Sequence, residues 1–141
     1  MKMVDVNVLI YAHREESARH AEYRRWLEGT LRTEGLGVSD LVLSGFLRIV
    51  THPRIMNPPT PRAAALAFAE QIRRHPRCAV IRPGHRHWDL FADLVRKAAC
   101  AGNHVSDAFH AALAIEAGCE WITTDRDFSR FPGLKWRHPL E

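Results

Sequence analysis

Cysteine is scarce in this sequence, and the few cysteines present argue against two kinds of stabilising site. The 141 residues include three cysteines, Cys78, Cys100 and Cys119. Their number is odd, and no two of them have the spacing of metal ligands. We therefore expect no disulfide framework and no zinc site, as is usual for a protein of a reducing compartment.

Long apolar runs are also missing. The opening segment MKMVDVNVLIYAHREE carries Asp5 within its apolar run and becomes charged at Arg14, which is unlike a signal peptide. No run approaches the ~18 apolar residues of a membrane span. We therefore expect a cytoplasmic protein with no membrane partner.

Lysine is rare, so the positive charge is carried mainly by arginine. Lysine occurs only at positions 2, 97 and 135, among 20 basic residues and a net charge of +4. The planar guanidinium suits phosphate because it can donate to two oxygens at once. A basic excess favours an anionic partner such as nucleic acid, although an arginine-rich proteome would give the same composition.

Short apolar segments alternate with segments of helical periodicity. Strands are predicted at residues 2–5, 36–38, 78–81, 121–124 and 134–136. Helices are predicted from about residue 7, and over 17–35, 39–51, 61–75, 85–102 and 106–118. This alternation indicates an α/β fold with a mostly parallel sheet. No linker divides the chain, so we expect one domain over residues 1–141.

Aspartates fall where predicted strands end or predicted helices begin. Asp5 ends the first strand, Asp107 follows the expected helix cap Ser106, and Asp125 and Asp127 follow the strand WITT. Ligands of open α/β sheets bind outside the carboxyl ends of the strands. Gathered carboxylates repel one another, and a hard cation such as Mg²⁺ relieves that repulsion through oxygen ligands.

Each acid also has a structural interpretation. Asp107 could simply stabilise the N-terminus of its helix through the helix dipole. Asp125 and Asp127 could simply shape a turn. Asp5 is harder to explain in this way, because it interrupts an apolar run where an unpaired charge is costly. Asn7 could either cap the first helix or orient the Asp5 carboxylate.

Three ordered segments resemble the PIN-domain family, and in particular the VapC-type toxins of bacterial toxin–antitoxin systems. They are VDVNVLIYA, SDAFHAALAIEAGC and WITTDRDFSRF. The resemblance implies an α/β/α sandwich and a Mg²⁺-dependent endoribonuclease, in which Mn²⁺ can substitute. It also implies a homodimer and a cognate VapB-like antitoxin. The family's first, third and fourth acids match Asp5, Asp107 and Asp125, with Asp127 as a common further acid.

One position departs from the family pattern. The family's second acid is a glutamate in the helix after the second strand, and the matching position here is Gly45. Asp40 lies five residues earlier, about 140° away around a helix, so it replaces the glutamate only if the helix begins close to the metal. We therefore predict a catalytic and metal-binding site of Asp5, Asp107 and Asp125. The alternative is a catalytically weak PIN domain that acts by binding RNA or antitoxin.

The remaining expectations concern binding surfaces. Arg14, Arg48 and Arg126 are candidates to grip phosphates beside the one that is cut. The segments SARHAEYRRWLEG and PRAAALAFAEQ are candidates for a groove that receives an antitoxin helix, although ordinary core packing would explain them equally well. His110 is expected to have a structural or surface role.

Overall fold

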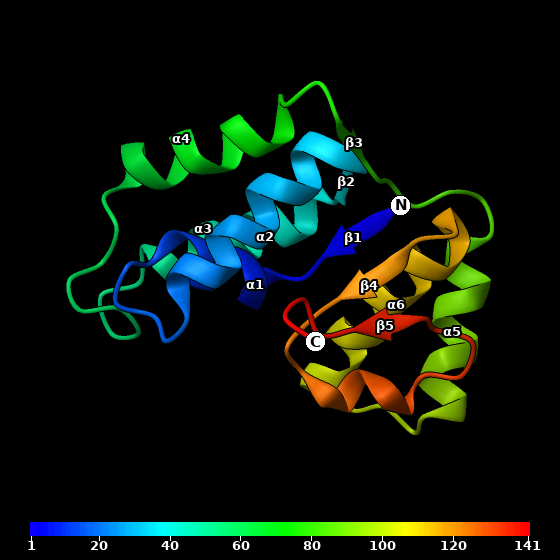
Figure 1. The fold of residues 1–141 in the computed structure, drawn as a ribbon. Helices are drawn as coiled ribbons and strands as arrows, with labels where there is room; N and C mark the ends of the chain where they lie inside the picture. The colour runs from blue at the N-terminus through cyan, green and yellow to red at the C-terminus, as the bar shows by residue number, and fades with distance from the viewer.

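Five parallel strands form the centre of the computed structural model, which describes residues 1–141 (Figure 1). The strands are β1 (Lys2–Val4), β2 (Leu36–Val38), β3 (Cys78–Val80), β4 (Glu120–Ile122) and β5 (Trp136–Arg137). Their order is β3-β2-β1-β4-β5, and every neighbouring pair is parallel. The predicted α/β class with a mostly parallel sheet is confirmed.

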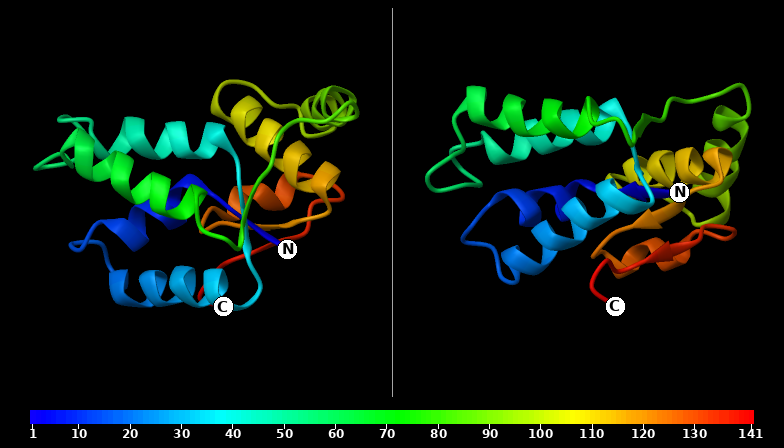
Figure 2. Two further views of the ribbon diagram at one scale, coloured as in Figure 1. Left: turned by 90° about the horizontal axis from the view of Figure 1, so that it is seen from above. Right: turned by 45° about the horizontal axis from the view of Figure 1, so that its top comes forward.

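Six α-helices connect the strands. They are α1 (Val6–His13), α2 (His20–Thr33), α3 (Asp40–Val50), α4 (Arg62–Arg73), α5 (His87–Lys97) and α6 (Asn103–Ala117), with a short 3-10 helix η1 (Arg126–Arg130) before β5. The chain moves outward from β1 to β3 and then crosses back to β4. Because parallel crossovers are right-handed, this reversal assigns α1–α4 and α5–α6 to opposite faces of the sheet. Figures 1 and 2 show the two groups of helices well separated.

The order of the strands also locates the site. β1 lies between β2 and β4, and the chain leaves β1 in one direction and returns on its other side. The crevice outside the carboxyl ends of β1 and β4 is therefore the topological switch point, where open α/β sheets bind their ligands.

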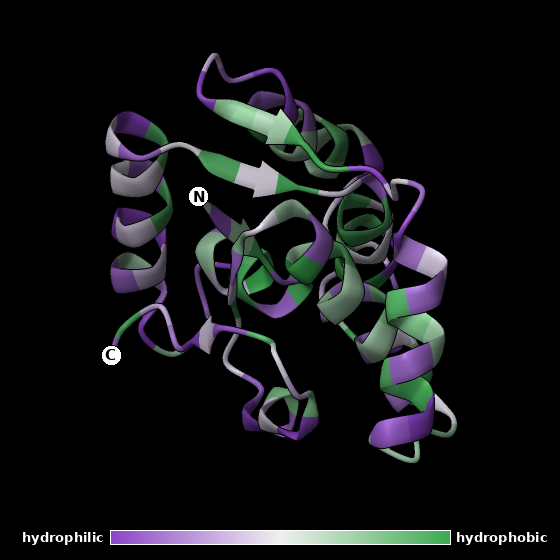
Figure 3. Cartoon of the chain, turned by 90° about the vertical axis from the view of Figure 1, so that its right-hand side faces the viewer, coloured by the Kyte–Doolittle hydropathy of each residue, from purple (hydrophilic) through white to green (hydrophobic).

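One hydrophobic core lies on both faces of the sheet. It contains 29 buried apolar residues, and its largest fully buried side chains are Trp121, Phe46 and Phe128. The strands are apolar because helices cover the sheet on both sides. Figure 3 shows strands that are mostly green or pale and helices that carry both hydrophobic and hydrophilic residues along their length. No helix in the structure combines the length and the apolar character needed to span a membrane.

The start of α6 differs from the prediction in a way that affects the site. The sequence predicts a helix from Ser106, whereas α6 begins at Asn103. Gly102, at φ 59° and ψ −130°, allows the chain to turn sharply there, in a conformation that strongly favours glycine. Asp107 is consequently the fifth residue of the helix. It lies just beyond the first turn, in which a negative charge interacts favourably with the helix dipole.

Three other helix ends also differ from the prediction. Asp5, and not Asn7, is the N-cap of α1, and its side chain accepts a hydrogen bond from the Val6 N–H. α2 begins at His20 and lacks the expected cap at Ser17. α5 ends at Lys97, five residues before the predicted end at 102, because the chain then adopts a positive φ at Ala99. The three cysteines are free in this structure.

Candidate active site

A cleft of about 550 Å³ opens at the switch point of the sheet. Its floor is the start of α1, and its walls are one face of α3 and the first two turns of α6. Asp5, Asp107 and Asp125 all line this cleft. They come from three separate segments of the chain, so the fold brings together the three predicted site residues.

Asp5 is the most deeply buried of the three, with 8% of its surface exposed. Its Oδ1 accepts a hydrogen bond from the Val6 N–H at 2.7 Å, and its Oδ2 accepts one from the Thr123 hydroxyl at 2.6 Å. Burial raises the pKa of Asp5 to about 6, against these two hydrogen bonds, and the negative charges of Asp107 and Asp125 raise it further. The charged form of Asp5 is therefore poorly stabilised without a cation.

Asn7 orients the Asp5 carboxylate and does not cap α1, which settles the two alternatives for this residue. Its Nδ2 donates to Asp5 Oδ2 at 3.4 Å and also lies 3.5 Å from Thr123 Oγ1. Its Oδ1 accepts from the Thr124 N–H at 3.4 Å. The Asn7 amide thus ties the start of α1 to the end of β4 and orients the Asp5 carboxylate.

Asp107 and Asp125 line the same cleft as Asp5, and their charges act on it. Burial raises the pKa of Asp107, and the neighbouring charge of Asp125 raises it further. Asp125 also shapes the turn after β4, as one of its two interpretations predicted, because its Oδ1 accepts a hydrogen bond from the Asp127 N–H at 2.9 Å. The Asp125 backbone N–H donates to Thr123 Oγ1 at 3.0 Å, so one hydroxyl group positions both Asp5 and Asp125.

The two other candidate acids lie outside the cleft. Asp40 forms a two-pronged ion pair with Arg73, with N–O distances of 2.8 and 3.2 Å, on the outer surface. Its suggested role as a substitute for the missing glutamate is therefore wrong, because its carboxylate is already paired and faces away from the site. Asp127 is exposed, and its carboxylate lies 4.0 Å from both His104 and Arg130.

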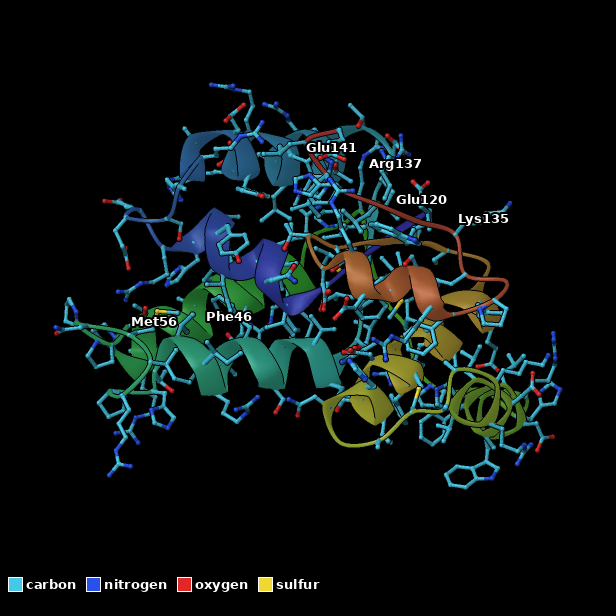
Figure 4. The ribbon with its side chains drawn as sticks, turned by 90° about the horizontal axis from the view of Figure 1, so that it is seen from below. Phe46, Met56, Glu120, Lys135, Arg137 and Glu141 are labelled. Carbon is cyan, nitrogen blue, oxygen red and sulfur yellow. The ribbon has the colours of Figure 1, made fainter.

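Gly45 lines the cleft, as the matching with the family predicts for this position. A Cβ added to Gly45 would lie 3.2 Å from Cγ2 of Val6, at the first residue of α1. The glycine therefore lets α3 pack closely against α1. Figure 4 shows these two helices side by side, with Phe46 between them.

The cleft fits a hard divalent cation by its donor chemistry. Its acidic side chains offer only oxygen, and the raised pKa of Asp5 and Asp107 marks negative charge that a cation would stabilise. As placed, however, no three acidic, histidine or cysteine side chains converge into a ready-made metal cluster. Asp5, Asp107 and Asp125 are the residues that could hold the ion, with water completing its coordination.

Only one of the three candidate arginines lies at the cleft. Arg48 lines the wall formed by α3. Arg14 is buried, where its guanidinium contacts Glu16 and donates to the Thr60 hydroxyl at 3.1 Å. Arg126 is exposed and pairs with Glu141 at 2.6 Å. The structure therefore contradicts the roles suggested for Arg14 and Arg126 and leaves Arg48 as a candidate.

Two polar residues of the site were missed in the sequence. Thr123 reads as one more strand former in WITT, and only its hydrogen bonds reveal its contact with the acids. The structural role predicted for His110 is borne out, because its buried ring stacks on Trp121 with the ring centroids 5.4 Å apart, but the ring also lines the cleft, which the sequence did not indicate. Burial lowers the pKa of His110 to about 4, so the ring is neutral at pH 7.

A second hollow, of about 420 Å³, lies between α1, α2 and α4. Its apolar lining consists of Ala12, Leu27, Leu31, Phe68 and Ile72. Polar side chains such as Arg24, Glu28 and His75 stand around it. The two segments predicted to form a groove, SARHAEYRRWLEG and PRAAALAFAEQ, contribute about half of its lining, and the rest comes from α1 and from the ends of α2 and α4.

Comparison with known proteins agrees with this fold and site. The family model of the PIN domain matches residues 2–134. Ribonuclease VapC43 of Mycobacterium tuberculosis is 43% identical over 142 residues, which cover 100% of this chain and 97% of that protein. Ribonuclease VapC25 of the same organism is 37% identical over 140 residues, covering 99% of each.

Solved structures show the same fold at low sequence identity. VapBC2 from Rickettsia felis, bound to promoter DNA, has a TM-score of 0.72 at 16% identity, covering 97% of each chain. VapC20 from Mycobacterium tuberculosis, described as a sarcin–ricin loop cleaving toxin, has a TM-score of 0.68 at 21% identity, covering 96% of this chain and 99% of that one. The chain belongs to the PIN-domain family, in the group formed by the VapC ribonucleases.

Proposed function

We propose that this protein is the toxin of a type II toxin–antitoxin system and acts as a Mg²⁺-dependent endoribonuclease on phosphodiester bonds of RNA. The observation that carries the proposal is the meeting of Asp5, Asp107 and Asp125 in one cleft at the switch point of the sheet. The relationship to named VapC ribonucleases over the whole chain supports it. Because its substrate would be RNA, the proposal places the protein in the cytoplasm.

The three carboxylates would share the work of the site. Asp5 and Asp107 would hold the cation, and Asp125 would help to position either the ion or the attacking water. When bound, Mg²⁺ or Mn²⁺ supplies charge stabilisation for the phosphorus centre and lowers the pKa of bound water. The hydrogen bonds from Thr123 and the Val6 N–H keep Asp5 in one orientation, so it need not reorganise as the negative charge of the reaction develops.

Cleavage of total bacterial RNA by the purified protein tests this function. We expect cuts with Mg²⁺ or Mn²⁺, none with EDTA, and none from an Asp107→Asn variant. Asp127→Asn is the matched control, because it removes an equal charge just outside the cleft and should still cleave. RNA binding without cleavage in either metal would support the alternative, a PIN domain weakened by the loss of the glutamate at Gly45.

The proposal also includes a VapB-like antitoxin and a homodimer. The hollow between α2 and α4 has the apolar floor and polar border that suit the amphipathic helix of a partner. An arginine of the antitoxin would enter the carboxylate cleft and displace the metal. We expect the purified complex to cleave RNA poorly. The substitution Arg24→Glu, at the exposed border of the hollow, should weaken antitoxin binding while cleavage by the toxin alone persists. Full cleavage by the intact complex would refute this inhibition.

The homodimer is the expectation for a VapC-type protein and can be tested separately. Sedimentation equilibrium of the purified chain should give about twice the monomer mass of 16.1 kDa. A mass of one chain at concentrations at which RNA is cut would contradict the dimer and leave the nuclease proposal intact.

A further inference from the structure

The wall of the cleft formed by α3 carries one positively charged side chain, Arg48, and one glycine, Gly45. Its lining residues are Leu41, Ser44, Gly45, Arg48 and Ile49. These spacings of three and four residues belong to one face of a helix. Ser39 caps α3 directly after β2, so this wall runs outward from the strand ends. Arg48 follows Gly45 by three residues, about 4.5 Å further out along the helix axis.

The guanidinium of Arg48 is available to a ligand. Arg48 is exposed and is the sole lysine or arginine among the residues that line the cleft. Arg14, Arg73 and Arg126 form ion pairs with acids, whereas Arg48 forms none. An unpaired guanidinium presents five donors in a planar fork that matches the oxygens of phosphate.

The glycine at position 45 explains why Arg48 is unpaired. A glutamate there would stand three residues before Arg48, a spacing at which opposite charges pair on a helix surface. Glycine offers no such partner. Gly45 therefore leaves the positive charge of Arg48 free on this face of α3.

We propose that Arg48 binds a phosphate next to the one that is cut, and so sets the register of a single RNA strand, and that Gly45 keeps Arg48 free for this contact. The inference rests on the proposed function, because it assumes that RNA occupies the cleft. Three carboxylates at the inner end of the cleft repel a phosphate chain. An arginine one turn further out attracts the chain without occupying the position of the metal.

RNA binding in EDTA tests this role, because the proposed cleavage is then switched off. The probe is an end-labelled single-stranded RNA oligonucleotide, followed by fluorescence anisotropy over a range of salt concentrations. Arg48→Ala is expected to weaken binding about tenfold, as the loss of one charge-assisted contact. The slope of log K against log salt should become shallower by about 0.7, the value for one phosphate contact on a single strand.

Two further variants separate this contact from a general loss of charge or structure. Arg48→Lys should restore the salt slope but only part of the affinity, because it keeps the charge and loses the planar fork. Arg25→Ala is the matched control, since it removes an exposed arginine from α2, outside the cleft. Its binding should stay within about twofold of wild type.

The role of Gly45 is tested by comparing Gly45→Glu with Gly45→Gln, which has nearly the same size and no charge. Gly45→Glu should weaken RNA binding more than Gly45→Gln does. Its effect should shrink when Arg48 is already alanine, because the two residues then no longer interact. Urea unfolding of each variant confirms that folded proteins are being compared.

The possible outcomes distinguish this inference from the proposed function. If Arg48→Ala binds RNA with the affinity and salt slope of the wild type, the role of Arg48 is wrong, whether or not the wild type cleaves. A wild type that binds RNA and does not cleave contradicts the nuclease alone and leaves the Arg48 comparison decisive. A wild type that does not bind RNA overturns both.

Discussion

Replacing Asp5 with asparagine should stabilise this protein at neutral pH when no divalent cation is present. The pKa of Asp5 is raised from 3.8 to about 6, mainly by burial and further by Asp107 and Asp125. A difference of about 2 pKa units corresponds to about 3 kcal/mol of unfavourable free energy in the charged folded state. Asparagine removes this cost, and its Oδ1 can still accept from the Val6 N–H. Its Nδ2 cannot accept the hydrogen bond that Thr123 donates to Asp5 Oδ2, so part of the gain is lost.

The pH dependence of this gain follows from the direction of the shift. Below pH 3.8 the carboxyl group is protonated in both the folded and the unfolded chain, so it contributes no difference. Between pH 3.8 and about 6 the unfolded chain releases the proton first, so the stability contributed by Asp5 falls as the pH rises. Above pH 6 the full cost is present.

Urea unfolding in EDTA at pH 4 and pH 7.5 measures the effect. Asp5→Asn should be more stable than wild type by about 1–2 kcal/mol at pH 7.5, because the lost hydrogen bond from Thr123 offsets part of the gain, and no more stable at pH 4. Mg²⁺ should stabilise the wild type more than the variant, because a ligand stabilises only the state that binds it. The exposed Asp127→Asn is the control and should change little. An Asp5→Asn protein that is no more stable than wild type at pH 7.5 would refute this reasoning.

Three further substitutions probe the surroundings of the site. Gly45→Ala should change the free energy of unfolding by less than about 1 kcal/mol in urea titrations, because the better helix propensity offsets the tight contact with Val6; a loss above 2 kcal/mol would show that the two helices cannot adjust. Asp40→Ala should leave Mn²⁺ affinity and RNA cleavage unchanged and cost less than about 1 kcal/mol, as expected for a surface ion pair. Thr123→Val should lower the free energy of unfolding by about 1–3 kcal/mol, because the hydrogen bonds of its hydroxyl with Asp5 and Asp125 are lost. It should also lower cleavage, whereas Thr123→Ser retains the hydroxyl that holds Asp5. Equal cleavage by both variants would contradict this role of Thr123.

The main features of the fold could be predicted from local patterns in the sequence. Strands β1 to β4 are short and mainly apolar, each is followed by a helix, and this alternation indicates a parallel sheet with helices on its faces. The position of the acids followed from the same pattern, because Asp5 and Asp125 directly follow strands whose carboxyl ends meet at one edge. Asp107 joins them since α6 runs back from that edge.

The features that could not be predicted depend on contacts between distant residues. Asp40 pairs with Arg73, 33 residues later in the chain, and no local pattern indicates that pairing. The hydrogen bond from Thr123 to Asp5 spans 118 residues and turns an ordinary strand residue into part of the site. The sequence predicts that Gly102 ends a helix. In the structure Gly102 has a positive φ and lies directly before α6, which begins at Asn103, three residues before the predicted start at Ser106.

The central claim is that Asp5, Asp107 and Asp125 suffice to bind a divalent cation without the glutamate that Gly45 replaces. Titration calorimetry with Mn²⁺ tests this most directly, on the wild type, on Asp107→Asn and on Asp127→Asn. The account predicts a binding event in the wild type that persists in Asp127→Asn and is lost or strongly weakened in Asp107→Asn. Binding that Asp107→Asn leaves unchanged, or no binding by the wild type, would contradict it.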